Sequence, residues 1–245
     1  MMRSFFLCGA ALVALALHPT SVSAQQDAAL EDGSIVGSTF AVDPLWVPTP
    51  EGFTFELRVG GYQPSFGGQF DTVFQGDLGP MIGAELDVHI WRVPYLGPLA
   101  AGVSFAWAEW DGPGRIVGSD QESGRTGLSL INFNALLVWR IDGLARYVDV
   151  PLILTGKVGP DFGYWESGEG STTGTGFSFG VRWAAQIALE LDFLEPRAAR
   201  RLDDEWGINH TEIFFEAFGS TMGEHMTQLE LGTSFAWAVG LGFTF

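Results

Sequence analysis

Two short clusters of side chains in this chain have the residue types that acyl-transfer chemistry uses. His210, Thr211 and Glu212 are consecutive, and Glu224 is followed by His225. A histidine beside a hydroxyl and a carboxylate can activate the hydroxyl as a nucleophile. Neighbouring residues on a strand point to opposite faces, however, so His210 and Thr211 would not converge on one substrate. We therefore expect no catalytic residues, and the alternative is an enzyme that modifies lipid acyl chains.

The sequence also contains few groups of residues that could bind a metal. Asp87 and His89 share one face of a predicted strand, but two ligands do not make a site. Cys8 is the single cysteine, and it lies in an apolar segment that we expect to be removed from the mature protein. The sequence therefore predicts neither a metal nor another cofactor.

The elements that must position all these side chains are strands, and the last seventeen residues show why. From Leu229 to Phe245 every odd position except Thr233 is apolar, and every even position is small or polar. A period of two places these side chains on opposite faces of a strand. A transmembrane barrel needs such strands, because lipid lies outside and a narrow polar lumen inside. We expect Phe245 to close the barrel, and this strand to be recognised by the barrel-assembly machinery.

Eight segments show this alternation, and together they predict an all-β, antiparallel up-and-down barrel. Polar, glycine-rich loops follow the first, third and fifth segments, and the latter two loops span about 111–125 and 166–176. An even strand number places both ends of the barrel on the periplasmic side. A ten-stranded barrel that also uses residues 38–47 is the alternative. The eight segments are 53–62, 82–91, 99–109, 127–139, 152–164, 177–193, 208–218 and 229–245.

Aromatic residues fall near both ends of the predicted strands, as the two girdles of a membrane barrel do. In a soluble barrel the bulky face would point inward, where eight strands leave room for few rings. The chain has nine Trp and twenty Phe, which favours lipid. The periplasmic girdle is predicted to contain Trp91, Tyr95, Trp139, Tyr147, Phe193, Phe243 and Phe245, and the outer girdle Trp107, Trp110, Tyr164, Trp165, Phe177 and Phe218.

Charged residues on the polar faces are predicted to meet inside the barrel. An eight-stranded interior is filled by side chains, and charges buried there must pair. We expect Arg58 to meet Glu85 or Asp87 of the adjacent strand. The excess of acids leaves a minor pore for small solutes as an alternative to a closed plug. The predicted lumen network comprises Glu56, Arg58, Glu85, Asp87, His89, Arg140, Lys157, Arg182, Glu190, Asp192, Glu212, Glu216 and Glu230.

The first fifty residues read as an export signal followed by a lead-in. Arg3 precedes an apolar core from Leu7 to Leu17, and Val22-Ser23-Ala24 supplies small residues for cleavage. The apolar run is too short for a membrane helix, which needs about 20 residues. We expect a signal peptide over 1–24, a periplasmic lead-in over 25–50 and the barrel domain over 51–245, in the outer membrane of a Gram-negative bacterium.

The charge of the chain limits its partners. The formal net charge is −17, and a polyanion repels nucleic acid. We therefore expect no nucleic-acid partner. The expected partners are outer-membrane lipids, and the chain is expected to be a monomer.

The connection between the sixth and seventh segments is predicted to contain a helix over 196–206, because Pro196 suits its first turn and Gly207 its end. Arg197, Arg200 and Arg201 on this helix are predicted to contact lipid phosphates at the periplasmic rim. The alternative is a solvated helix that only caps the barrel.

The segment from Leu191 to Glu216, LDFLEPRAARRLDDEWGINHTEIFFE, resembles a family of outer-membrane β-barrel proteins found mainly in myxobacteria and their relatives. The similarity is greatest at residues 192–200, at Leu202-Asp203 and at residues 207–211, and weaker similarity extends over most of 50–245. The resemblance implies location and fold, and it carries over no catalytic residues. We therefore predict an integral outer-membrane protein with a structural or surface-interaction role and a plugged lumen.

Overall fold

The computed structural model describes residues 49–64, 70, 74, 78–115, 122–169, 172–223 and 229–245. Residues 47–245 form one compact unit. The predicted signal peptide, all but the last two residues of the lead-in, and the optional strand at 38–47 lie outside the described residues.

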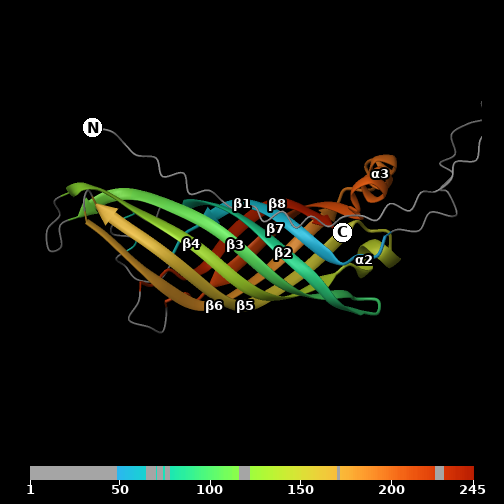
Figure 1. Ribbon diagram of the computed structural model, residues 1–245, viewed down its shortest axis with the longest axis horizontal. Coiled ribbons are helices and arrows are strands. Elements are labelled where there is room, and N and C mark those ends of the chain that lie inside the picture. The colour runs from blue at the N-terminus through green and yellow to red at the C-terminus, as the bar shows by residue number, and fades with distance from the viewer. Residues whose placement is uncertain are drawn as a thin grey trace, which may run out of the picture. The chain divides into compact units, whose positions relative to one another are not determined.

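Eight antiparallel strands close into a barrel in which each strand pairs with its neighbours in sequence and the last pairs with the first (Figure 1). This confirms the predicted fold class and strand number. The strands are β1 (Phe53–Tyr62), β2 (Gly79–Val93), β3 (Gly97–Arg115), β4 (Glu122–Ile141), β5 (Leu152–Glu169), β6 (Thr172–Glu190), β7 (His210–Ser220) and β8 (Thr233–Thr244).

The seam between β1 and β8 runs from Thr54–Thr244 to Gly61–Trp237. At its end the ring of Phe53 stacks on that of Phe245 with 4.7 Å between centroids. The backbone N–H of Phe53 donates to the carbonyl of Phe245, and the N–H of Phe245 donates back to the carbonyl of Phe53. Phe245 therefore takes part in closing the barrel, as predicted.

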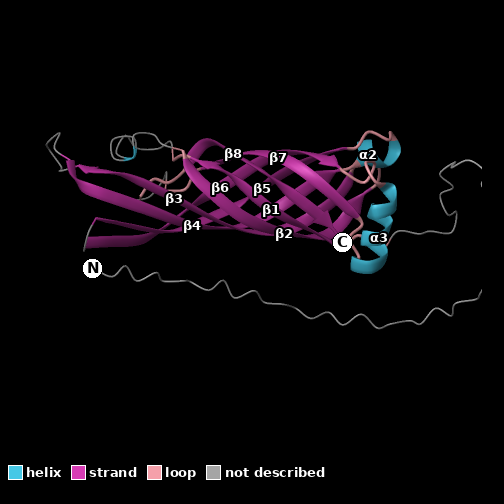
Figure 2. Cartoon of the chain, turned by 90° about the horizontal axis from the view of Figure 1, so that it is seen from above, coloured by secondary structure: helices cyan, strands magenta, loops and turns pink. Residues whose placement is uncertain are grey.

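Two helices lie at the end of the barrel where the chain terminates, which we call the helix end (Figure 2). The predicted helix appears as α3 (Pro196–Trp206), which begins with a proline and ends at Gly207 in the left-handed conformation, with φ of 70°. The shorter α2 (Gly143–Tyr147) was not predicted, because one turn carries no helical periodicity. None of the helices among the described residues has the length and apolar character of a membrane span.

At the opposite end, the loop end, the strands are longer than predicted. The β2–β3 ladder stops at Met81–Ala108 and the β6–β7 ladder at Arg182–Ser220. The β3–β4 and β5–β6 ladders continue to residues 115–122 and 169–172. Four strands therefore form an extension beyond the closed barrel, which is visible for β3 and β4 in Figure 2. The prediction of polar loops over 111–125 and 166–176 was wrong for residues 111–115, 122–125, 166–169 and 172–176, which belong to strands.

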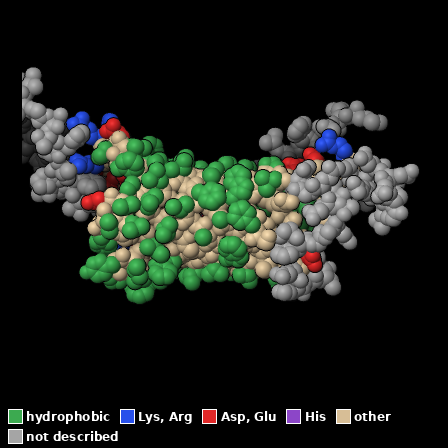
Figure 3. All heavy atoms as spheres, turned by 180° about the vertical axis from the view of Figure 1, so that it is seen from behind, with side chains coloured by type: hydrophobic (Ala, Val, Ile, Leu, Met, Phe, Trp, Pro, Cys, Tyr) green, Lys and Arg blue, Asp and Glu red, His purple; other side chains and the backbone are tan. Residues whose placement is uncertain are grey.

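Burial alternates along the strands: large apolar side chains are exposed on the outside, and the charged side chains are buried on the inside together with a set of apolar ones. On β1, Leu57 and Val59 are exposed, whereas Thr54, Glu56 and Arg58 are buried. Figure 3 shows a face on which hydrophobic side chains cover the barrel wall, while charged side chains gather near its two ends. The usual arrangement of a water-soluble barrel is thus reversed.

Candidate functional site

The most concentrated chemistry of the barrel lies in its lumen, where Lys157 from β5 meets three carboxylates. Its ammonium lies 2.9 Å from Glu56, 2.5 Å from Glu85 and 3.1 Å from Glu216. Arg58 contacts the same three acids, at 2.8 Å from Glu85 and 2.9 Å from Glu216. The expected contact between Arg58 and Glu85 is confirmed. Every one of these side chains is buried.

Two further arginines extend this network along the barrel axis. Arg182 on β6 donates to Glu216 at 2.7 Å, and its guanidinium lies 3.8 Å from the centroid of the Phe218 ring. Nearer the helix end, Arg140 on β4 forms a two-pronged ion pair with Glu212 on β7. A buried charge is costly without a partner. Cross-barrel pairing therefore offsets the cost of burying these charges.

A polar chain of side chains lies on the same inner face. Asn134 donates to Ser104 and to Asn132, and Asn132 donates to Asp161. Asp161 also accepts a hydrogen bond from Ser220 on β7. The two asparagines face the lumen, as the alternation of β4 predicts.

Apolar side chains close the lumen at the loop end. Tyr62 donates from its hydroxyl to the carbonyl of Leu231 at 2.5 Å, and the indole of Trp110 donates to the carbonyl of Tyr62. A cavity beside this cluster has a volume of about 10 Å³, roughly what one water molecule needs. The buried cluster at this end includes Tyr62, Phe70, Phe74, Trp110, Phe218, Met222 and Leu231.

Three rings predicted in the outer girdle lie in or against this buried cluster, and one of them, Trp165, is half-buried. Trp110 and Phe218 were predicted in the outer girdle, yet both are buried inside the barrel. The signal was present, because Trp107 and Trp110 differ in parity on β3 and so point to opposite faces.

The prediction that Glu230 joins the lumen network was wrong, because its side chain is exposed. Phe218 pairs with Ala236, but Ser220 pairs with Thr233, so one extra residue of β8 is inserted here. Such a bulge reverses the alternation before it. Leu231 consequently turns inward and is completely buried.

Glu190 and Asp192 were also predicted in the lumen network, and they lie at the helix end instead. Both contact Nδ1 of His210, at 3.0 Å and 2.6 Å respectively. His89 is half-buried on the inner face of β2 and contacts the hydroxyl of Thr54 at 3.1 Å. Asp87 is buried there, as predicted.

The segment that enters β1 is held at the helix end by residues of the predicted family motif. Asp203 on α3 accepts hydrogen bonds from the backbone and hydroxyl of Thr49. Asn209 donates to the carbonyl of Thr49. Two residues further along, the carboxylate of Glu51 forms ion pairs with Arg92 and Arg146. Sequence reasoning missed this clamp because its partners are 154 and 160 residues apart.

The predicted lipid-contact arginines lie on α3. Arg197 and Arg201 are exposed and Arg200 is half-buried. Large apolar side chains on the same connection are also exposed, namely Phe193, Leu194 and Trp206.

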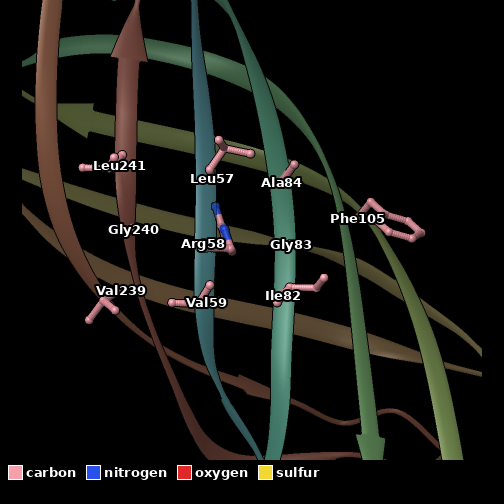
Figure 4. Close-up of a pocket in the computed structure, with 10 residues that line it drawn as sticks. All are labelled: Leu57, Arg58, Val59, Ile82, Gly83, Ala84, Phe105, Val239, Gly240 and Leu241. Atoms are coloured by element: carbon pink, nitrogen blue, oxygen red, sulfur yellow. The ribbon is translucent and has the colours of Figure 1, made fainter. Parts of the chain in front are cut away.

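A groove of about 510 Å³ lies on the outside of the wall, over β8, β1, β2 and β3 (Figure 4). Gly83, Ala84 and Gly240 are the small residues among those that line it. The exposed side chains of Leu57, Val59 and Ile82 contribute to its rim. The groove is therefore separate from the charged lumen.

No family model and no curated protein matches the chain. Three solved barrels are similar in structure. Ail of Yersinia pestis, solved with the heparin analogue sucrose octasulfate, is 10% identical with a TM-score of 0.42, and the alignment covers 80% of this chain and 97% of Ail. Neisserial surface protein A is 8% identical with a TM-score of 0.45, covering 79% and 97%. The N-terminal barrel domain of Pseudomonas aeruginosa OprF is 10% identical with a TM-score of 0.38, covering 80% and 98%. This level of similarity indicates nothing about a ligand or partner.

Proposed function

We propose that the protein is an integral barrel of a bacterial outer membrane, with a closed lumen and a structural or surface-interaction role. The observation that carries this proposal is the reversed polarity of the barrel. Charged side chains are buried inside, and large apolar side chains are exposed on the outer faces of the strands. Burying one such side chain is worth about 1.5–3 kcal/mol, so an outer surface of this kind favours a lipid environment.

The arrangement of the two ends supports an orientation with the helix end in the periplasm. Both β1 and β8 begin or end there, next to Phe53 and Phe245. Even-stranded bacterial barrels have this arrangement, with the longer hairpins outside. The extension formed by β3 to β6 would then project from the cell and offer a surface for contacts. Among the described residues, no second strand pairs with β3 beyond Ala108 or with β6 before Arg182, although the carbonyls of Val181 and Phe179 accept backbone hydrogen bonds from Thr221 and Gly223.

The helix end is proposed to contact lipids of the inner leaflet through α3. Arg197 and Arg201 are exposed, and so are Phe193, Leu194 and Trp206 on the same connection. Exposed cations together with exposed apolar side chains are typical of helices that lie at a membrane surface. Arg200 belongs to the same proposed contact. The C-terminal strand is proposed to engage the barrel-assembly machinery, and the resemblance to the myxobacterial family stays a prediction.

Outer-membrane fractionation together with heat-modifiable gel mobility tests the proposal. We expect the protein in the outer-membrane fraction, and an unboiled band that migrates differently from the boiled one. Release with soluble periplasmic proteins would contradict it.

Conductance in planar lipid bilayers tests the closed lumen. We expect no steps above the background of a mock preparation, because ion pairs and apolar rings fill the interior. Regular single-channel steps would favour the pore instead. Lipid A mass spectra that change with expression of the protein would favour the enzyme.

A further inference from the structure

We propose that Glu190, Asp192 and His210 form a zinc site at the helix end of the barrel. One atom from each side chain lies within 4.8 Å of the other two. Two carboxylates and one imidazole are a ligand set that suits Zn²⁺. The three residues come from the end of β6 and the start of β7, on either side of the connection that contains α3.

The arrangement around Nδ1 of His210 points to a cation rather than to a simple hydrogen bond. Asp192 lies 2.6 Å and Glu190 lies 3.0 Å from this single nitrogen. One N–H can donate well to only one of the two oxygens. A dication in the centre satisfies the nitrogen and both carboxylates. In a tetrahedral site with Zn–N and Zn–O distances of about 2.0–2.2 Å, neighbouring donor atoms lie about 3.3–3.6 Å apart. The distance from Nδ1 would therefore widen by roughly 0.7–1.0 Å for the Asp192 oxygen and by roughly 0.3–0.6 Å for the Glu190 oxygen.

The groups behind the three ligands are placed as in protein zinc sites. Nε2 of His210 lies 3.3 Å from Glu51. A histidine that binds metal through one nitrogen usually donates its other N–H to a carboxylate, which orients the ring. The second oxygen of Asp192 accepts the backbone N–H of Thr211 at 3.2 Å. Ring and carboxylate are thus both oriented by the surrounding protein.

The site has room for exchange with solvent and an open coordination position. Between 19% and 26% of the three ligand side chains is exposed. Water can therefore occupy the fourth position of a tetrahedral ion. Because the ligands join β6 to β7 across an 18-residue separation, the ion would fasten the connection that carries α3.

Zinc titration of the full-length mature barrel in detergent, after removal of metal with a chelator, tests this proposal. We expect one Zn²⁺ per chain in competition with a fluorescent zinc indicator. His210→Ala and Asp192→Asn should each weaken binding at least tenfold. Glu51→Gln, which removes a charge behind the histidine, should weaken it by about 10- to 100-fold.

The matched control is Asp204→Asn, which makes the same charge change at an exposed position of α3. It should leave zinc affinity unchanged, and heat-modifiable mobility verifies that each variant is folded. X-ray absorption of the zinc-loaded protein should show one imidazole among oxygen ligands. Absence of stoichiometric binding, equal weakening by Asp204→Asn, or a spectrum without imidazole overturns the proposal. Equal binding of Mg²⁺ at the same concentration also overturns it, because magnesium does not favour a nitrogen ligand.

Discussion

At the scale of single residues, Lys157 is the centre of the barrel interior. Three acids surround its ammonium, all three also contact Arg58, and one of them, Glu216, also contacts Arg182. Removing one member of a buried ion group leaves charges without partners, which costs more than the pair itself contributes. The positions of these charges were predictable from alternation, and so was the contact of Arg58 with Glu85 on the adjacent strand. The partners across the barrel were not, because they lie on strands far apart in sequence.

We expect Lys157→Met to lower the free energy of unfolding by about 3–5 kcal/mol. Denaturant unfolding of the barrel in detergent measures this change. Adding Glu85→Gln to Lys157→Met should restore part of the loss, because one carboxylate is then neutral. The control is Glu230→Gln at an exposed position, with an effect within about 0.5 kcal/mol. If Lys157→Met lowered the free energy of unfolding no more than Glu230→Gln does, the charges of the lumen would have to be hydrated.

At the scale of elements, sequence patterns succeeded where the two faces of a strand meet different surroundings. The bounds of β1 and α3 agree with the prediction, the first through strict alternation and the second through Pro196 and Gly207. The pattern failed in the extension, where polar residues occur on both faces and no period of two remains. Thr233, the one odd polar position of the last segment, was the overlooked sign of the bulge in β8.

Two leucines that alternation would treat alike, Leu229 and Leu231, differ in burial and are therefore expected to differ in the cost of substitution. Leu231 is completely buried and Leu229 is 38% exposed. We expect Leu231→Asp to cost more than about 2 kcal/mol, because it buries a charge among apolar side chains. Leu229→Asp should cost much less. Unfolding midpoints in detergent measure both, and equal costs would contradict the inward position of Leu231.

The clamp on Thr49 makes a prediction for α3. Asp203→Ala removes an acceptor that is buried at the helix end. We expect a loss of about 1–3 kcal/mol, and faster cleavage before β1 in limited proteolysis. Asp204→Ala, one position along the same helix but exposed, is the control and should leave cleavage unchanged. Identical cleavage of the two variants would argue against the clamp.

At the scale of the whole molecule, the orientation of the barrel can be measured with single cysteines. Cys8 is the one cysteine of the chain, and it is expected to be removed with the signal peptide. An introduced Glu230→Cys should then react with a membrane-impermeant maleimide on intact cells. Asp204→Cys should react only after the outer membrane is permeabilised. These sites lie at the loop end and the helix end respectively, and the unmodified protein is the control for background labelling. The opposite pattern would mean that the helix end faces outward.

The seam between β1 and β8 also has a consequence for the order of events in folding. Seven of the eight ladders join strands that follow one another, but the seam joins residues up to 190 positions apart, as at Thr54 and Thr244. Contacts of such sequence separation form late, because a long chain must first be ordered. Until then, β1 and β8 each present an unpaired edge, which invites pairing with other chains. The growing sheet therefore needs protection during that interval, and the period before closure is when mutations near Phe53 or Phe245 should do most harm.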